Sequence, residues 1–122
     1  MPRGLKPSYQ RELKEAENTF VNRHYSLSWR YLERAHILAQ PYPYDHTAVH
    51  WKMFCFGIKV KNFTEVLGQI PRLLVGGVKS FVGHIPVGNT GGANVPPLQP
   101  MEIPEDLAAI IDNTKAKKYV FL

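Results

Sequence analysis

Apolar residues recur every three or four positions through the first two thirds of the chain, which is the period of an amphipathic helix. The pattern predicts four helices, at about residues 9–23, 27–39, 46–60 and 65–74. Their inward stripes comprise Leu13, Ala16 and Phe20; Trp29, Leu32, Ala35, His36 and Ala39; Val49, Met53, Phe56 and Val60; and Val66, Ile70 and Leu73. The joints between the helices are short, so consecutive helices are expected to be antiparallel neighbours.

Polar residues and prolines mark the expected ends of these helices. Ser26 is the predicted N-cap of the second helix, and Asp45 is that of the third. Pro41 and Pro43 are expected to end the second helix, because proline cannot continue the hydrogen-bond ladder. Pro71 falls inside the fourth helix, where its missing N–H predicts a kink.

The last third of the chain has a different composition. Six glycines lie between positions 76 and 92, and five prolines lie between positions 86 and 104. This spacing disfavours regular structure, so we expect an extended segment that wraps across the helices. A short helix is predicted from Pro104 to about Asp112, because proline and acidic residues suit a helix N-terminus. Four apolar residues of the tail are expected to be buried against the helices: Val95, Leu98, Met101 and Ile103.

These elements predict an all-α fold of two antiparallel helical hairpins wrapped by the tail. A weak internal repeat supports the pairing, because residues 25–38 resemble residues 63–76. Each half has a faint likeness to a tetratricopeptide hairpin, although two units are too few for a solenoid. A chain of 122 residues fits one domain, 1–122, with a helical part at about 8–80 and the tail at about 81–122.

Composition narrows the classes of function. Fifteen Lys and Arg against ten Asp and Glu give a net charge of +5, without a basic motif, so no dedicated nucleic-acid binding is expected. No apolar run is long enough to cross a membrane. The N-terminus lacks the apolar core of a secretory signal, so a cytoplasmic location is expected. The single cysteine, Cys55, cannot form an internal disulfide, which agrees with a reducing compartment.

Two pairs of polar residues predict a metal site between the second and third helices. His46 and His50 lie one helical turn apart, a spacing that lets two imidazoles chelate one ion. Glu33 and His36 form a Glu-x-x-His pair on the preceding helix. With a turn centred near residues 41–42, the two pairs lie level with each other. We therefore expect these four residues to bind a transition metal ion, such as zinc, iron or copper.

Other polar residues could extend this site. Glu17 of the first helix could add a carboxylate, and Met53 could add a soft sulfur that favours copper. One face of the fourth helix carries three residues that could form a polar network: Glu65, Gln69 and Arg72.

Alternative interpretations remain open. The histidines could cap helix ends or satisfy buried hydrogen bonds, in a helical-hairpin module that binds a protein partner through Tyr42 and Tyr44. A catalytic version of the metal site, such as a non-haem iron centre, needs an open coordination position, and the sequence leaves enzyme activity undecided. A glycine-containing turn in the tail could be structural or could bind an anion through its backbone: Gly88, Asn89, Thr90 and Gly91.

Several segments together resemble a small bacterial family of uncharacterised proteins. The segments are residues 32–38, the His46 and His50 pair, residues 68–73, and above all Val-Gly-Asn-Thr-Gly at 87–91 with Pro-Met-Glu-Ile-Pro at 100–104. The resemblance covers about residues 9–107. It implies a bacterial single-domain protein with an integral tail, and it implies no established activity.

Overall fold

The computed structural model of the chain describes residues 1–81, 90–93 and 101–120, with side chains placed in all of these except 75–81 and 115–120. Within these ranges the chain forms five helices: α1 Lys6–Val21, α2 Tyr25–Ala39, α3 Pro43–Lys59, α4 Phe63–Phe81 and α5 Glu105–Val120. No strand occurs in the described ranges, so the predicted all-α fold is confirmed. None of the described helices is both long enough and apolar enough to cross a membrane.

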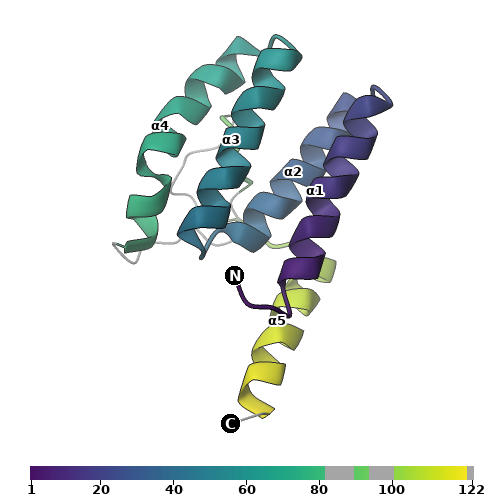
Figure 1. The fold of residues 1–122 in the computed structure, drawn as a ribbon, viewed down its shortest axis with the longest axis vertical. Helices are drawn as coiled ribbons and strands as arrows, with labels where there is room; N and C mark the ends of the chain where they lie inside the picture. The colour runs from purple at the N-terminus through teal and green to yellow at the C-terminus, as the bar shows by residue number, and fades with distance from the viewer. Residues whose placement is uncertain (82–89, 94–100, 121–122) are drawn as a thin grey trace.

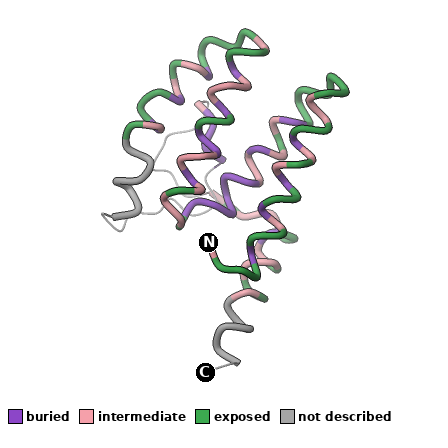
Figure 2. Tube along the Cα trace, in the orientation of Figure 1, coloured by how far each residue is buried: buried purple, intermediate pink, exposed green. Residues whose placement is uncertain are grey.

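The first four helices form two hairpins. Helix α1 packs against α2, and α3 packs against α4, as the short joints predicted. Contacts between α2 and α3 join the hairpins, and α5 contacts α2 (Figure 1). The central pair α2 and α3 therefore carries most of the interior, and Figure 2 shows buried positions concentrated along these two helices.

Helix α2 contributes more buried apolar residues than any other helix in the described chain. Five of the eleven buried apolar residues described belong to it: Leu32, Ala35, Ile37, Leu38 and Ala39. The other six are Leu5, Tyr9, Ala16, Val49, Met53 and Leu107. Burial of these side chains stabilises the fold by roughly 1–3 kcal/mol for each of the larger ones.

The two hairpin joints have the same backbone structure. Arg23 and Lys61 both adopt a left-handed conformation, with φ of 63° and 59°. In the first joint His24 N donates to the Thr19 carbonyl at 2.9 Å, and in the second Asn62 N donates to the Gly57 carbonyl at 2.8 Å. This is the hydrogen-bond pattern of a Schellman C-terminus, which satisfies otherwise unpaired helix carbonyls. Arg23 and Lys61 are separated by the same offset as the internal repeat.

The helix starts differ from those predicted. Helix α2 begins at Tyr25 with His24 at the N-cap position, so Ser26 lies inside the helix and does not cap it. Helix α3 begins at Pro43, and Asp45 lies in its first turn. Pro43 therefore starts α3, because proline fits the first turn of a helix, where its missing N–H costs nothing.

The later helices are longer than predicted. Helix α4 continues through Pro71 to Phe81, and Figure 1 shows its path curving along the way. Ile70, expected inside, is 43% exposed, because α4 turns a polar face toward the core. Helix α5 continues to Val120, well beyond Asp112.

The described parts of the tail agree in part with the expected wrap. Ile103 is half-buried and packs against the core, and Met101 is half-buried. Val95 and Leu98 lie outside the described residues, as do Gly88 and Asn89 of the glycine-containing turn.

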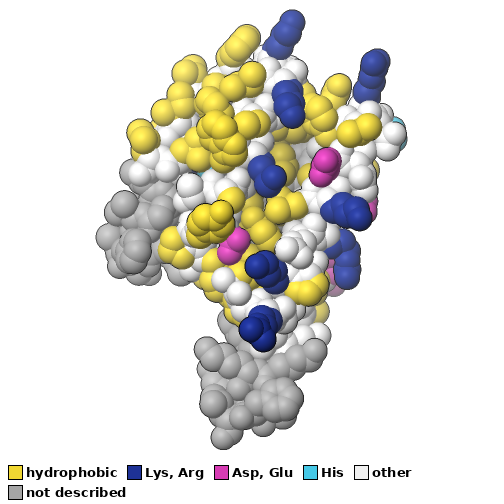
Figure 3. All heavy atoms as spheres, viewed as in Figure 1, with side chains coloured by type: hydrophobic (Ala, Val, Ile, Leu, Met, Phe, Trp, Pro, Cys, Tyr) yellow, Lys and Arg dark blue, Asp and Glu magenta, His cyan; other side chains and the backbone are white. Residues whose placement is uncertain are grey.

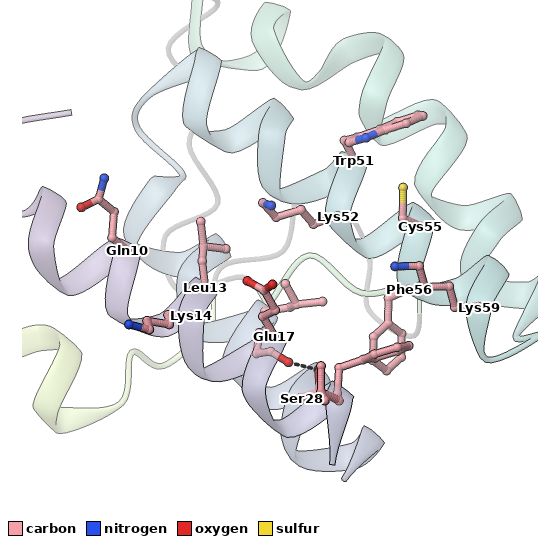
Figure 4. Close-up of a pocket in the computed structure, with 14 residues that line it drawn as sticks. Gln10, Leu13, Lys14, Glu17, Ser28, Trp51, Lys52, Cys55, Phe56 and Lys59 are labelled. Atoms are coloured by element: carbon pink, nitrogen blue, oxygen red, sulfur yellow. Dashed lines mark hydrogen bonds between the residues drawn. The ribbon is translucent and has the colours of Figure 1, made fainter. Parts of the chain in front are cut away.

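An open groove of about 900 Å³ separates α1 from α3 (Figure 4). Leu32 and Ser28 of α2 contribute to its lining, together with apolar residues and lysines from the flanking helices. Glu17 lines this groove and is exposed.

Candidate metal centre

Three histidines from α2 and α3 converge in the interior. The Nε2 atoms of His36 and His46 are 2.9 Å apart, and each lies 3.1 Å from Nε2 of His50. Each residue is at most 2% exposed. In the described part of the chain, these three are the residues whose potential ligand atoms all lie within 4.8 Å of one another.

The short connection between α2 and α3 produces this convergence. Tyr42 N donates to the Ala39 carbonyl at 2.8 Å, and His46 N donates to the Tyr42 carbonyl at 2.8 Å. The chain therefore reverses within a few residues, and the last turn of α2 faces the first turns of α3. His36 then meets His46 and, one turn further along α3, His50.

Hydrogen bonding alone cannot satisfy all three contacts of this triangle. Each Nε2 atom carries either a proton or a lone pair. At least two of the three Nε2 atoms must therefore be in the same state, both protonated or both with a lone pair. The contact between those two atoms places N–H against N–H, or lone pair against lone pair, and is not a hydrogen bond. A cation that accepts all three lone pairs removes this conflict.

The spacing of the three nitrogens fits a single ion. Atoms about 3 Å apart can each lie about 2.0–2.1 Å from an ion placed to one side of their plane, which is the usual distance from zinc to a histidine nitrogen. Any two nitrogens then subtend roughly 90–100° at the ion. The three histidines would thus occupy one face of the coordination sphere.

Gln69 of α4 fixes the orientation of His50. Its amide nitrogen donates to Glu65 Oε1 and to the Gly91 carbonyl, each at 2.8 Å. Both partners are acceptors, so the amide oxygen of Gln69 faces His50 Nδ1, 2.6 Å away. His50 therefore carries its proton on Nδ1 and directs the Nε2 lone pair at His36 and His46.

The segment 90–93 covers the histidines. The carboxylate of Glu65 accepts a hydrogen bond from Ala93 N, 3.0 Å from each of its oxygens. Gly91 has φ of +85°, and a Cβ on it would lie 2.5 Å from the His36 ring. A Cβ on Gly68 of α4 would similarly lie 2.3 Å from Cβ of Ala93. Only glycine at these two positions lets the segment lie this close to α2 and α4.

The Glu33 carboxylate is not part of the group of converging ligand atoms. Burial raises its pKa, and the nearby charge of Glu65 raises it further. Arg30 and the Thr90 side chain act in the opposite direction and lower the pKa. Glu65 is linked to His50 through Gln69, and Glu33 lies close enough to Glu65 for their charges to interact. Both carboxylates would help to offset the charge of a cation.

The structure also describes several of the other candidate residues named from the sequence. Glu17 is exposed in the groove of Figure 4 and belongs to no group of converging ligand atoms in the described chain. Met53 is fully buried in the apolar core, among the largest of its side chains. Of the four residues in the glycine-containing turn, the described pair Thr90 and Gly91 is buried beside the histidines.

The sequence indicated a polar face on α4 that could extend the site, but not which of its residues would contact the histidines. Glu65 and Gln69 were recognisable as one face of a helix, and their hydrogen bond confirms a polar network there. The contact between Gln69 and His50 depends on how α4 packs against α3, which helical periodicity does not specify. The sequence could not predict the role of Ala93, because this residue contributes only its backbone N–H.

A family model described as a protein of unknown function (DUF3703) matches residues 3–111. Neither a curated protein nor a solved structure matches the chain. The family match confirms the resemblance to uncharacterised proteins and brings no ligand or reaction with it.

Proposed function

The chain belongs to the DUF3703 family, whose function is unknown, and from its geometry we propose that it binds one transition metal ion through Nε2 of His36, His46 and His50. The observation that carries the proposal is the triangle of three buried nitrogens 2.9–3.1 Å apart. Hydrogen bonds satisfy at most two sides of that triangle, and an ion satisfies all three vertices at once.

The surroundings of the triad support a cation. Gln69 holds His50 in the tautomer that a metal ligand needs, and Glu65 holds Gln69 in turn. A divalent ion on three neutral imidazoles adds two positive charges to the interior. Glu33 and Glu65 place carboxylates close enough to influence each other and to compensate that charge.

Nitrogen ligands narrow the class of ion. Imidazoles suit zinc, iron, copper and nickel, whereas calcium and magnesium prefer shells of oxygen atoms. The burial of all three histidines, and the packing of Gly91 on His36, favour holding or handling an ion over exchanging substrates at it. We therefore propose metal handling or sensing as the role, and a catalytic centre as a less supported version.

A metal titration of untagged protein tests the proposal. Added zinc, copper, iron or nickel should raise the melting temperature of the apo-protein, since an ion at 100 times its dissociation constant stabilises the native state by about 2.7 kcal/mol. The gain should fall as the pH drops below about 6.5, because a proton competes with the ion for each imidazole. Elemental analysis of the purified protein should find the ion in a one-to-one ratio.

Matched histidine variants locate the effect. His46→Gln combined with His50→Gln should abolish the melting shift, with the helical circular dichroism retained. His24→Gln removes an exposed histidine at the start of α2 and should respond to metal like the unsubstituted chain. A melt that none of these ions shifts, in protein that purifies without metal, would exclude the proposed function.

A further inference from the structure

Between residues 63 and 74, helix α4 presents its polar face to the interior and its apolar face to solvent. The buried residues of this part of the helix are Glu65, Gln69 and Arg72. Its exposed residues, through position 74, are uncharged: Phe63, Thr64, Leu67, Ile70, Pro71 and Leu74. Exposed helix faces are normally polar, so this reversal is typical of a surface that binds another molecule.

The large apolar residues of that face form a regular seam. Phe63, Leu67, Ile70 and Leu74 are 66%, 68%, 43% and 77% exposed. Their separations of four, three and four residues are those of alternating a and d positions in a coiled coil. We call these four residues the α4 seam. The spacing suits a second helix, whose side chains can fit between those of α4.

Helix α3 widens the seam into a larger face. Trp51 is 56% exposed and Ile58 is 51% exposed, and Trp51 stacks on Phe54 with ring centroids 5.5 Å apart. The space-filling view shows hydrophobic side chains gathered over α3 and α4 (Figure 3). Together the α4 seam, Trp51 and Ile58 expose roughly 700–800 Å² of surface, against about 800 Å² buried by each partner in an interface of standard size.

We propose that this face binds the same face of a second copy of the chain, with the α4 helices antiparallel across a two-fold axis. The axis would pass between Leu67 and Ile70, so that Leu67 meets the second copy's residue 70 and Phe63 meets its residue 74. The seam complements itself in this arrangement, because an apolar residue faces an apolar residue at every position.

Charge does not oppose a contact between two copies at the α4 seam. Two chains of net charge +5 repel each other, so a contact between copies is most favourable where no charged side chain lies in it. The α4 seam meets that condition, whereas the groove between α1 and α3 is lined by Lys14, Lys52 and Lys59. The dimer does not depend on the metal, because the seam lies on the face of α4 opposite Gln69.

The oligomeric state of the full chain tests the proposal. Sedimentation and light scattering over a wide range of concentration should give twice the mass of one chain. Leu67→Glu should weaken self-association by at least roughly tenfold, since it buries an unpaired charge at the centre of the interface. Asn18→Glu adds the same charge on exposed α1 and should leave the dimer intact. Circular dichroism and metal binding check that each variant is folded.

A charge-pair experiment tests the antiparallel register. When studied separately, the Ile70→Glu and Leu67→Lys variants should each be monomeric. An equimolar mixture should form heterodimers, because the carboxylate introduced in one chain then faces the ammonium group introduced in the other. A wild-type chain that stays monomeric, a dimer indifferent to Leu67→Glu, or a mixture that stays monomeric would overturn the proposal. Binding of monomers to vesicles of anionic phospholipid would assign the face to a membrane surface instead.

Discussion

At the scale of single residues, Gln69 has the largest consequences for the metal centre. It is fully buried, and its amide connects His50 to Glu65 and to the Gly91 carbonyl. The side chain contacts both His50, a proposed metal ligand, and the segment 90–93, and it is not itself one of the proposed ligands. Such partners orient an imidazole and set which nitrogen carries the proton.

Gln69→Leu should weaken metal binding by roughly 10- to 100-fold while the protein still folds. The leucine leaves His50 Nδ1 without its acceptor, so the Nδ1 tautomer loses its preference. Competition with a chromogenic chelator measures the change in affinity. Gln10→Leu changes an exposed glutamine of α1 in the same way, and it should leave the affinity unchanged. Equal affinities for the two variants would contradict the orienting role of Gln69.

Tyr9 links the stability of the protein to alkaline pH. Burial, with smaller contributions from Asp45 and Tyr44, raises the pKa of Tyr9 to about 12. Its hydroxyl contacts the Asp45 carbonyl at 3.4 Å. A pKa raised in the folded state means that the stabilisation is complete below the unfolded value near 10 and is lost as the pH rises toward 12.

The free energy of unfolding of Tyr9→Phe should therefore fall less than that of the unsubstituted protein between about pH 10 and 12. The difference between the two decreases should be about 2 kcal/mol at pH 12. Urea unfolding at a series of pH values measures the slope. Tyr25→Phe serves as the control, because Tyr25 is 42% exposed and does not contribute to the raised pKa of Tyr9. A slope that Tyr9→Phe leaves unchanged would show that Tyr9 does not contribute to the alkaline transition.

At the scale of the elements, the two hairpins share one joint. Arg23 and Lys61 hold left-handed backbone conformations that suit glycine, and each ends a helix in the same hydrogen-bond pattern. The side chains of both residues are exposed, so neither is held there by packing. Each joint therefore carries backbone strain that a glycine would remove.

Arg23→Gly and Lys61→Gly should each raise the free energy of unfolding by about 1 kcal/mol. The same substitution at Arg11, an exposed position inside α1, should lower it by about 1 kcal/mol. Thermal melts of the three variants give the comparison. Destabilisation by glycine at both joints would show that the left-handed conformations are not strained.

At the scale of the whole molecule, Arg34 connects three helices. Its guanidinium donates to both oxygens of Glu12 at 2.9 and 2.8 Å and also pairs with Asp106. These hydrogen bonds tie α1 and α5 to α2. The hydrogen bond from Arg34 lowers the pKa of Asp106. The ion pair therefore stabilises the folded protein fully above the ordinary pKa of a carboxyl group, and this stabilisation is lost as the pH falls through the lowered pKa.

Arg34→Met should lower the free energy of unfolding by about 3 kcal/mol, because Glu12 is only 7% exposed and would keep its charge without a partner. Arg30→Met provides the comparison. Arg30 lies 3.9 Å from Glu33 and its side chain is 45% exposed, so its loss should cost less than about 0.5 kcal/mol. Urea denaturation separates the two, and similar losses would refute the structural importance of Arg34.

The sequence by itself determined the helical fold and the histidine triad. Apolar periodicity and short joints specify the helices and their antiparallel order, because each amphipathic face must be buried against a neighbour. The positions of His36, His46 and His50 follow from the same facts. Two residues four apart share a helix face, and a tight turn fixes which residue of the preceding helix lies opposite.

Only the tertiary structure decided what surrounds the triad. Periodicity placed Ile70 inside, whereas α4 is rotated so that Gln69 and Glu65 meet the histidines and the α4 seam faces outward. A helix carrying both a polar and an apolar face can bury either one. The choice depends on what the neighbouring element offers, and here α3 offers His50. The position of the segment 90–93 was also decided only by the tertiary structure. Its contacts use the Gly91 carbonyl and the Ala93 N–H. Every peptide unit carries these groups, so no sequence pattern distinguishes them.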